Sequence, residues 1–285
     1  MYIKSTQWPA PAKLNLFLHI NEKRADGYHE LQTLFQLLDR GDYLDFEVND
    51  TSKLELFCQQ TDLITPDNLI LRAAQCLQEA TQTRLGARIW LHKFLPIGGG
   101  VGGGSSDAAT TLVALNHLWG CGLSQLALQH LGQTLGADVP LFIGGQTAFA
   151  EGIGEQLYPV LLAEPWYLII YPKATAISTA TLFNHPDLPR HTPKMDWNAI
   201  SLENTRNDFE DLVKKNHPQV EKALNWLLQY KPSRMTGTGA SVFSQFYTKE
   251  EALHYLNKLP SSFEGFIAQG QNTSSLYHHL EELHL

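Results

Sequence analysis

Apolar and polar positions alternate in the first third of the chain, and this period of two predicts strands. The leucines of residues 12–20 alternate with other residues, and an Asp-Gly turn signal follows them, which predicts strand, turn and strand. The alternation recurs in 43–48 and 53–58, on either side of the polar stretch NDTS, and predicts a second hairpin. Residues 87–95 are a further strand candidate, leading into a glycine-rich segment.

Helical periods begin after these strands. Residues 67–81 place their apolar side chains on one helical face. A second helix is predicted to begin near Ser106 and to end at the glycines of 120–122, and a third to cover 124–135 behind a serine cap. The next segment, 137–155, is expected to return to extended structure.

The second half of the chain supplies another set of elements. Residues 166–172 have the composition of a buried strand. Helices are predicted around 205–216, 218–229 and 249–259, and strands at 240–246 and 265–269. The pattern therefore predicts an α+β protein with two lobes, an N-terminal lobe of 1–155 and a smaller C-terminal sandwich of 156–285.

Composition narrows the class of protein. A formal net charge of −8 and a pI of about 5.8 provide no positive field for nucleic acid. The apolar runs are too short for a membrane span, and the N-terminus has no leader pattern, so we expect a cytoplasmic protein. Three widely spaced cysteines, Cys58, Cys76 and Cys121, favour buried free thiols over disulfides or a zinc site.

The segment PIGGGVGGGSSDAA, residues 96–109, has six glycines within 98–104. It formally contains G-x-G-x-x-G, but no acidic residue follows between 108 and 137 to bind a dinucleotide's ribose. A Walker loop would need a lysine that is absent, and the protein-kinase motifs H-R-D and D-F-G are absent too. A tightly packed glycine turn remains the plain structural alternative.

We favour a turn whose amides, with the positive end of the following helix, bind a phosphate group. Ser105 or Ser106 is expected to cap that helix and to donate to the phosphate. Asp107 is expected to complement the helix dipole in the first turn, without a part in chemistry.

Three motifs then resemble the small-molecule kinases of the GHMP superfamily: PAPAKLNLFL, LPIGGGVGGGSSDAA and TGTGASVF. Together with RADGYHEL and LGADVPLF, they are similar to the branch that acts on 4-diphosphocytidyl-2-C-methyl-D-erythritol. The resemblance spans essentially the whole chain. The middle motif departs from the superfamily's usual Gly-Leu-Gly, with Val101 and extra glycines in its place, which leaves the individual phosphate contacts open.

This resemblance implies a two-lobed kinase with its active site in the cleft between the lobes. It implies that ATP, with Mg²⁺, phosphorylates the 2-hydroxyl of that substrate, giving the 2-phosphate and ADP, in non-mevalonate isoprenoid biosynthesis. Another GHMP-type kinase and a catalytically silent nucleotide-binding protein remain the alternatives. The expected partner is the small-molecule substrate, with no nucleic acid or membrane, and the expected state is a monomer or weak homodimer.

The resemblance also implies roles for single residues. Asp138 matches the catalytic base and Lys13 the cation beside it, whereas the residues taken alone read as a turn aspartate and a solvated strand lysine. Asn15 falls on the same strand face as Lys13 and is a candidate partner for substrate or lysine. No residues are predicted to hold a metal ion.

Two further groups of positions follow from the resemblance. Those expected to bind ATP are Asn68, Lys93, Pro96, Ile97, Gly98, Gly99, Gly100, Val101, Gly102, Gly103, Gly104, Ser105 and Ser106, with Asn68 and Lys93 in the adenine pocket. Those expected to bind substrate are Tyr28, His29 and Phe183 around the cytosine, and Gly237 and Gly239 near the phosphates. A core aromatic at 183 and a plain turn at 236–240 remain the alternatives.

Overall fold

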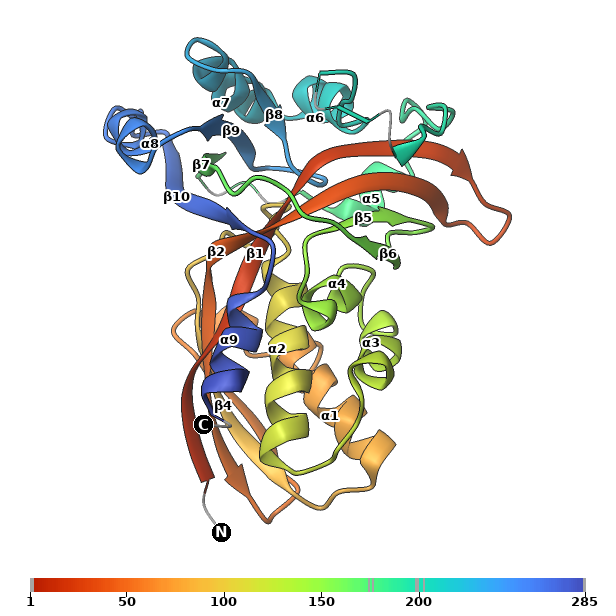
Figure 1. The fold of residues 1–285 in the computed structure, drawn as a ribbon, viewed down its shortest axis with the longest axis vertical. Helices are drawn as coiled ribbons and strands as arrows, with labels where there is room; N and C mark the ends of the chain where they lie inside the picture. The colour runs from red at the N-terminus through yellow and green to blue at the C-terminus, as the bar shows by residue number, and fades with distance from the viewer. Residues whose placement is uncertain (1–2, 174, 176, 198–199, 202, 284–285) are drawn as a thin grey trace.

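The computed structural model describes residues 3–173, 175, 177–197, 200–201 and 203–283. Two long strands, β1 (Ile3–Lys23) and β2 (His29–Asn49), form an antiparallel hairpin that runs through both halves of the molecule (Figure 1). Their register pairs Lys13 with Leu37 and Lys23 with His29. The predicted strand, turn and strand at the start of the chain is confirmed, with longer strands than the alternation indicated.

The second predicted hairpin is wrong. Residues 43–48 belong to β2, which pairs with β4 (Gly86–His92), and β3 (Leu54–Cys58) pairs in parallel with the far side of β4. Of the β3 residues only Leu56 is buried, whereas β4 buries most of its apolar positions. The more apolar strand, β4, therefore lies between β2 and β3 in the sheet. The alternation of apolar residues within each strand does not predict this order.

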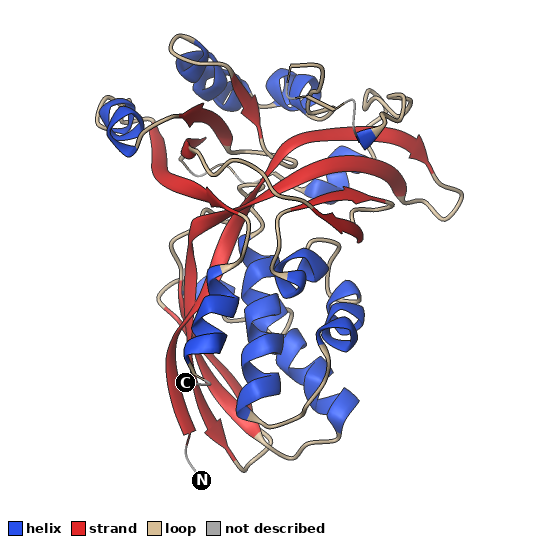
Figure 2. Cartoon of the chain, in the orientation of Figure 1, coloured by secondary structure: helices blue, strands red, loops and turns tan. Residues whose placement is uncertain are grey.

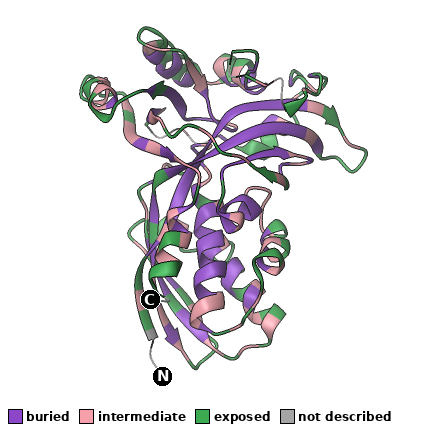
Figure 3. Cartoon of the chain, viewed as in Figure 1, coloured by how far each residue is buried: buried purple, intermediate pink, exposed green. Residues whose placement is uncertain are grey.

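One face of this sheet is covered by helices (Figure 2). They are α1 (Leu69–Thr81), α2 (Gly103–Leu118), α3 (Gln125–Gln133), α4 (Val139–Gly144) and α9 (Ser275–Glu282), with a short 3₁₀ turn η1 (Thr61–Leu63) before α1. Their apolar faces and the inner face of the sheet share one hydrophobic core, which includes Trp8, Phe46, Leu112 and Phe142. Burial is concentrated along β1, β2 and α2 (Figure 3).

The extended structure expected for 137–155 is only partly present. Residues 139–144 form α4, with Pro140 in its first turn and Gly145 in the left-handed region just after its end. Strands β5 (Ala148–Glu151) and β6 (Gln156–Pro159) follow as a hairpin. The apolar run VPLFIG suits a buried helix as well as a strand, and its early proline favours the helix.

The second half of the chain adds antiparallel strands in the order β10-β7-β9-β8, and β10 joins them to the first sheet by pairing with β2. Its strands are β7 (Trp166–Pro172), β8 (Ser233–Met235), β9 (Val242–Phe246) and β10 (Phe263–Gln271), and its helices are α5 (Thr179–Phe183), α6 (Glu210–Asn216), α7 (Pro218–Leu228) and α8 (Lys249–Leu256). The strand predicted at 166–172 is confirmed, while the helix predicted from 205 begins at Glu210. The mixed helix and sheet content matches the predicted α+β class.

The two halves are joined by the hairpin and by the end of the chain. Leu18, Ile20 and Leu31, from the far end of the hairpin, lie in the core of the second half. Helix α9 returns to pack against β1, where the Trp8 and His279 rings meet edge to face at 4.9 Å. The division into 1–155 and 156–285 stays a prediction.

The structure also bears on composition-based expectations. The three cysteines carry free thiols, and each is half-buried. Among the described residues, no helix has the length and apolar character needed to cross a bilayer.

Candidate active site

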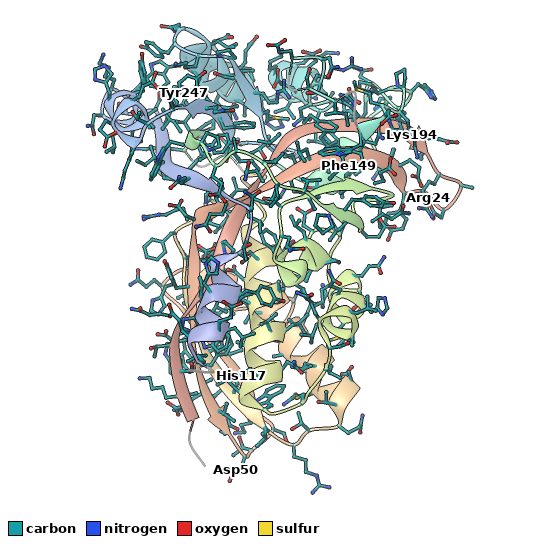
Figure 4. The ribbon with its side chains drawn as sticks, in the orientation of Figure 1. Arg24, Asp50, His117, Phe149, Lys194 and Tyr247 are labelled. Atoms are coloured by element: carbon teal, nitrogen blue, oxygen red, sulfur yellow. The ribbon has the colours of Figure 1, made fainter. Side chains whose placement is uncertain are left out.

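A cavity of about 520 Å³ lies where the hairpin, the glycine segment and the turn at 236–240 meet. Residues from both halves of the chain line it, which is the arrangement expected of a cleft between two lobes. The lining groups include Lys13, Asn15, Thr33, Phe35, Asn68, Lys93, Asp107, Asp138, Phe183, Gly237, Thr238 and all residues from Pro96 to Ser105. The elongated β1–β2 hairpin passes the cavity and ends beyond it, where Figure 4 shows Arg24 and Lys194.

The glycine segment leads directly into α2. Gly98, Gly100 and Gly102 have φ angles of 65°, 76° and 78°, a region that favours glycine. Gly102 is the N-cap residue and α2 begins at Gly103, earlier than the predicted start near Ser106. The unpaired amides of the first turn therefore come from glycines, which leaves the approach to them free of side chains.

Two expectations around this turn are wrong, the serine cap and the place of Asp107, while the phosphate contact of Ser105 or Ser106 stays a prediction. No serine side chain caps α2, and the Ser106 hydroxyl is buried without a hydrogen-bond partner among the described residues. Ser105 lines the cavity, but Ser106 does not. Asp107 lies beyond the first turn, so it does not serve the helix dipole there.

The second glycine turn packs against the first. A side chain at Gly100 would bring its Cβ within 2.5 Å of the Thr236 carbonyl oxygen, and the Ser241 amide donates to the Gly99 carbonyl at 3.1 Å. Gly237 lines the cavity. Gly239 does not line the cavity. A Cβ at this position would contact the Met235 side chain, so Gly239 faces the protein interior.

Lys13 and Asp138 meet inside the cavity. The Lys13 ammonium lies 3.2 Å from Oδ2 of Asp138, donates to Oδ1 of Asn15 at 2.5 Å and donates to the Gly100 carbonyl at 3.2 Å. The lysine side chain is 4% exposed, whereas that of Asp138 is 31% exposed. The pair therefore presents a carboxylate to the cavity with its cation behind it.

Asp138 reaches this place from a helix rather than a strand. The sequence suggested the start of a strand, but Asp138 is the N-cap residue of α4. Asn15 is held on both sides, since its Nδ2 donates to Thr33 at 2.9 Å and its backbone amide donates to the Thr236 hydroxyl at 2.8 Å. These bonds connect β1, β2 and the second glycine turn around the lysine.

Lys93 has a different environment. Its ammonium donates to Asp42 at 2.5 Å and to Asp107 at 2.9 Å, and the side chains of all three are at most 6% exposed. The other oxygen of Asp42 accepts the amides of Phe94 and Leu95. Burial raises the pKa of Asp107 to about 7. The Lys93 ammonium partly opposes this rise in pKa, and the Asp42 carboxylate adds to it. This cluster ties the end of β4 to α2 behind the glycine segment.

Asn68 caps α1. Its side-chain oxygen accepts from the Ile70 amide at 2.9 Å, and its Nδ2 donates to the Leu63 carbonyl at 2.8 Å. Asn68 and Lys93 both line the cavity. Both of these residues, which were expected at the adenine, also form hydrogen bonds within the protein, Asn68 to α1 and Lys93 to two aspartates.

Of the three residues expected around the cytosine, only one lines the cavity. Tyr28 is 59% exposed in the hairpin turn, and His29 is buried. The Phe183 ring stacks on the His29 ring, with centroids 5.0 Å apart and an interplanar angle of 30°. Phe183 lines the cavity, whereas Tyr28 and His29 do not.

Several residues in the cavity lining, or bound to predicted site residues, were not singled out from the sequence. Thr33 and Phe35 alternate with core residues on β2, a pattern that also fits ordinary packing. Asp42 gives no local signal, because its lysine partner is fifty-one positions away. Arg190, which binds His29, lies in a segment without secondary structure.

Comparison with known proteins places this architecture in a family. The model of the GHMP kinases N terminal domain matches residues 68–146, and that of the GHMP kinases C terminal matches 189–265. A curated relative from Shewanella pealeana, named 4-diphosphocytidyl-2-C-methyl-D-erythritol kinase, is 59% identical over 95% of this chain and 96% of its own. One from Shewanella frigidimarina with the same name is 56% identical over 98% of this chain and 96% of its own.

Solved structures agree. A crystal structure of 4-(cytidine 5′-diphospho)-2C-methyl-D-erythritol kinase has a TM-score of 0.80 and 30% identity, covering 94% of this chain and 99% of its own. Mevalonate kinase of Methanococcus jannaschii, at 17% identity and a TM-score of 0.62 over 95% of this chain and 98% of its own, shares the fold. The chain thus belongs to the 4-diphosphocytidyl-2-C-methyl-D-erythritol kinase family of ATP-dependent GHMP kinases.

Proposed function

We propose that this protein transfers the γ-phosphoryl group of ATP to the 2-hydroxyl of 4-diphosphocytidyl-2-C-methyl-D-erythritol, in non-mevalonate isoprenoid biosynthesis. The observation that carries the proposal is the Lys13–Asp138 pair at 3.2 Å, in a cavity that the glycine turn before α2 also lines. Phosphoryl transfer needs positioning and charge stabilisation, with a group that takes the hydroxyl proton. The high identity to relatives of that name supports the choice of substrate.

Asp138 is the proposed base. Its carboxylate is partly exposed to the cavity, so a substrate hydroxyl can approach it, and the Lys13 ammonium lies 3.2 Å from it. Asn15 and the Gly100 carbonyl fix the ammonium, and Lys13 therefore holds one position while the proton moves to Asp138. In this role Lys13 also stabilises negative charge on the attacking oxygen.

The glycine segment is the proposed phosphate site. Amides of 98–104 and the N-terminal end of α2 provide donors for phosphate oxygens, and Ser105 adds a hydroxyl beside them. Mg²⁺ would neutralise charge on the β- and γ-phosphates when bound. The described residues contain no cluster of three metal-ligating side chains, so phosphate and water would supply most ligands of the ion, and Asp138 and Ser105 are oxygen donors in the cavity lining that could add to them.

The remaining residues would orient the two ligands. Asn68 and Lys93 would border the adenine, and Gly237 would approach the substrate phosphates with its backbone, with Gly239 supporting that turn from behind. Tyr28, His29 and Phe183 would hold the cytosine. A monomer or weak homodimer in the cytoplasm, without nucleic acid or membrane partners, completes the proposal, and sedimentation velocity would test the state of assembly.

A substrate panel tests the proposal. Purified protein with ATP and Mg²⁺ would receive 4-diphosphocytidyl-2-C-methyl-D-erythritol, mevalonate, homoserine or galactose, with ADP release as the readout. We expect turnover with the first compound alone and its loss in Lys13→Met, while Lys4→Met, a change at an exposed lysine of the same strand, keeps it. Turnover with another compound would reassign the substrate. Thermal stabilisation by an ATP analogue without turnover on any compound would indicate a silent nucleotide-binding protein.

A further inference from the structure

Asn207 binds the backbone of the second glycine turn. Its Nδ2 donates to the Met235 carbonyl at 2.9 Å and to the Gly237 carbonyl at 2.8 Å, while its Oδ1 accepts the Phe209 amide at 3.0 Å. The side chain is buried, and it does not line the cavity. An asparagine amide has two hydrogens to donate, and both are committed to this turn. Asn207 therefore holds two carbonyls of the turn from outside the cavity lining.

Asn207 is in turn fixed to β1 by the residues on either side of it. The Leu18 amide donates to the Arg206 carbonyl at 3.0 Å, and the Asp208 amide donates to the Leu18 carbonyl at 2.9 Å. The Asp208 carboxylate also accepts the Ile20 amide at 2.7 Å. The second glycine turn is thus tied, through Asn207, to the strand that carries the proposed catalytic lysine.

The second glycine turn has the φ pattern of a type II′ β-turn. The Gly239 amide donates to the Thr236 carbonyl at 3.0 Å. Gly237 has a φ of 55°, whereas Thr238 keeps a negative φ. The peptide bond between these two residues is trans, so its carbonyl and its N–H point in opposite directions. Because the carbonyl points to Asn207, the Thr238 amide points away from it, and this amide has no acceptor among the described residues.

The free amide belongs to a residue of the cavity lining, since both Gly237 and Thr238 line the cavity. We propose that Asn207 is a positioning residue: by binding the Gly237 carbonyl it presents the Thr238 amide to the cavity, where this amide donates to a diphosphate oxygen of the substrate. The inference rests on the proposed function, which brings the substrate phosphates to this turn. An N–H donor to a charged phosphate makes a stronger hydrogen bond than one to a neutral acceptor.

Loss of the Asn207 donor would change which group faces the ligand. The Met235 and Gly237 carbonyls would lose their partner, and a buried carbonyl without a partner is costly. Glycine adapts its backbone at little cost, so the turn can move until the Gly237 carbonyl meets water in the cavity. A phosphate would then approach a carbonyl oxygen in place of an N–H donor, and substrate binding would weaken.

Steady-state kinetics of Asn207→Leu tests this role, because leucine keeps the branched shape and has no donor. We expect KM for 4-diphosphocytidyl-2-C-methyl-D-erythritol to rise about ten-fold or more, while KM for ATP changes by less than about two-fold and kcat by less than about three-fold. Asn116→Leu is the matched control. Asn116 also donates to a loop carbonyl, that of Leu123 at 3.0 Å, but it lies outside the cavity lining, so both KM values should match the wild type.

The outcomes separate this inference from the proposed function. An unchanged KM for the substrate in Asn207→Leu, a rise in KM for ATP alone, or an equal rise in Asn116→Leu overturns the role of Asn207 and leaves the proposed function standing. A wild-type chain that does not turn over this substrate overturns the proposed function and the inference with it.

Solution NMR of the wild type keeps the inference testable if Asn207→Leu does not fold. The chain would be labelled with nitrogen-15 threonine, the Thr238 resonance assigned by comparison with Thr238→Ser, and the substrate added in the absence of ATP. We expect the Thr238 amide proton to move downfield, as a donor to a phosphate oxygen does. An unchanged Thr238 resonance at saturating substrate would contradict the inference, whatever the activity of the enzyme.

Discussion

The cavity has two buried lysines, and their surroundings differ. Lys13 pairs with one aspartate, Asp138, whose side chain is 31% exposed, and its other contacts are neutral oxygens of Asn15 and Gly100. Lys93 lies between two buried carboxylates, Asp42 and Asp107. The first lysine has a partner that a ligand can reach, whereas the second is enclosed.

This difference suggests that Lys13 serves the reaction and that Lys93 serves the stability of the fold. A buried ion pair adds little net stability, but removal of one member leaves the other charge without a partner. At Lys93 the stranded groups would be two buried carboxylates, while at Lys13 the stranded carboxylate has access to solvent. Substitutions at the first site should therefore affect turnover, and substitutions at the second should affect folding. The following changes test that contrast, from the largest expected effect to the smallest.

Asp138→Asn should lower kcat by about 10²–10⁴-fold, because the amide cannot take the hydroxyl proton. Stability should fall less than in Lys93→Met, because the new amide oxygen can still accept from the buried Lys13 ammonium, which also keeps Asn15 and Gly100 as partners. Steady-state kinetics and urea denaturation measure the two effects, with Asp62→Asn, at an exposed aspartate of η1, as the matched control. An Asp138→Asn enzyme with undiminished kcat would remove the assigned base.

Lys93→Met should lower the free energy of unfolding by about 3–5 kcal/mol, because Asp42 and Asp107 would share the interior without a cation. Lys13→Met, the matched change, should cost less stability and abolish turnover. Urea denaturation at several pH values measures the difference. If both variants lost the same stability, the proposed contrast between the lysines would be wrong.

The pH dependence of this loss has a defined sign. The folded-state pKa of Asp107 is raised above its usual value, so its contribution to stability is fully present at acidic pH and is lost as the pH rises toward about 7. Lys93 opposes that rise, so its removal moves the pKa of Asp107 still higher. The stability deficit of Lys93→Met should therefore be larger at pH 8 than at pH 5, and a deficit independent of pH would contradict this.

Gly100→Ala should lower the free energy of unfolding by about 2–3 kcal/mol. Its φ of 76° is unfavourable for alanine, and the new Cβ would stand 2.5 Å from the Thr236 carbonyl. Gly104→Ala is the matched control, because its Cβ would meet only Leu69 at 3.8 Å and a helical alanine is favoured by about 0.5–1 kcal/mol. Thermal denaturation of both variants should show opposite shifts; equal shifts would mean that the strain at Gly100 is unimportant.

Asn68→Ala should cost about 1 kcal/mol through loss of the α1 cap, and should raise KM for ATP. Ser124→Ala removes the equivalent cap from α3, away from the cavity lining, so a similar loss of stability should leave KM unchanged. Thermal denaturation and ATP titrations give the two readouts. An identical KM in both variants would show that Asn68 serves α1 alone.

Local sequence signals predicted the secondary-structure elements better than they predicted which strands pair with each other. The alternation in 53–58 indicated a strand correctly, but the neighbour of that strand is β4, thirty residues later along the chain. Pairing depends on which strand buries more apolar surface, a property of the whole sheet. The run at 139–144 fits either secondary structure, and only its packing against α2 and α3 settles the choice in favour of a helix.

For the site too, the sequence predicted individual residues better than it predicted their contacts. Glycines at 98–104 signalled a close backbone approach, and the structure shows where the approach occurs, at Thr236 on a turn far along the chain. The motifs marked Lys13 and Asp138, and the structure brings them into contact. Arg190 carried no signal, because three of its acceptors are backbone carbonyls of nearby residues and the fourth, His29, is brought to it only by the tertiary structure.

Helix α9 has a consequence for synthesis of the protein. Its His279 covers Trp8 of β1, and β10, which precedes it, pairs with β2 at Leu37 and Leu38. During translation the ribosome releases α9 long after β1, so the face of Trp8 that His279 covers stays open until α9 has been made, although Phe46 and His117 can pack on the ring earlier. Chaperones that shield exposed aromatic surface have their longest opportunity to act on this protein during that interval.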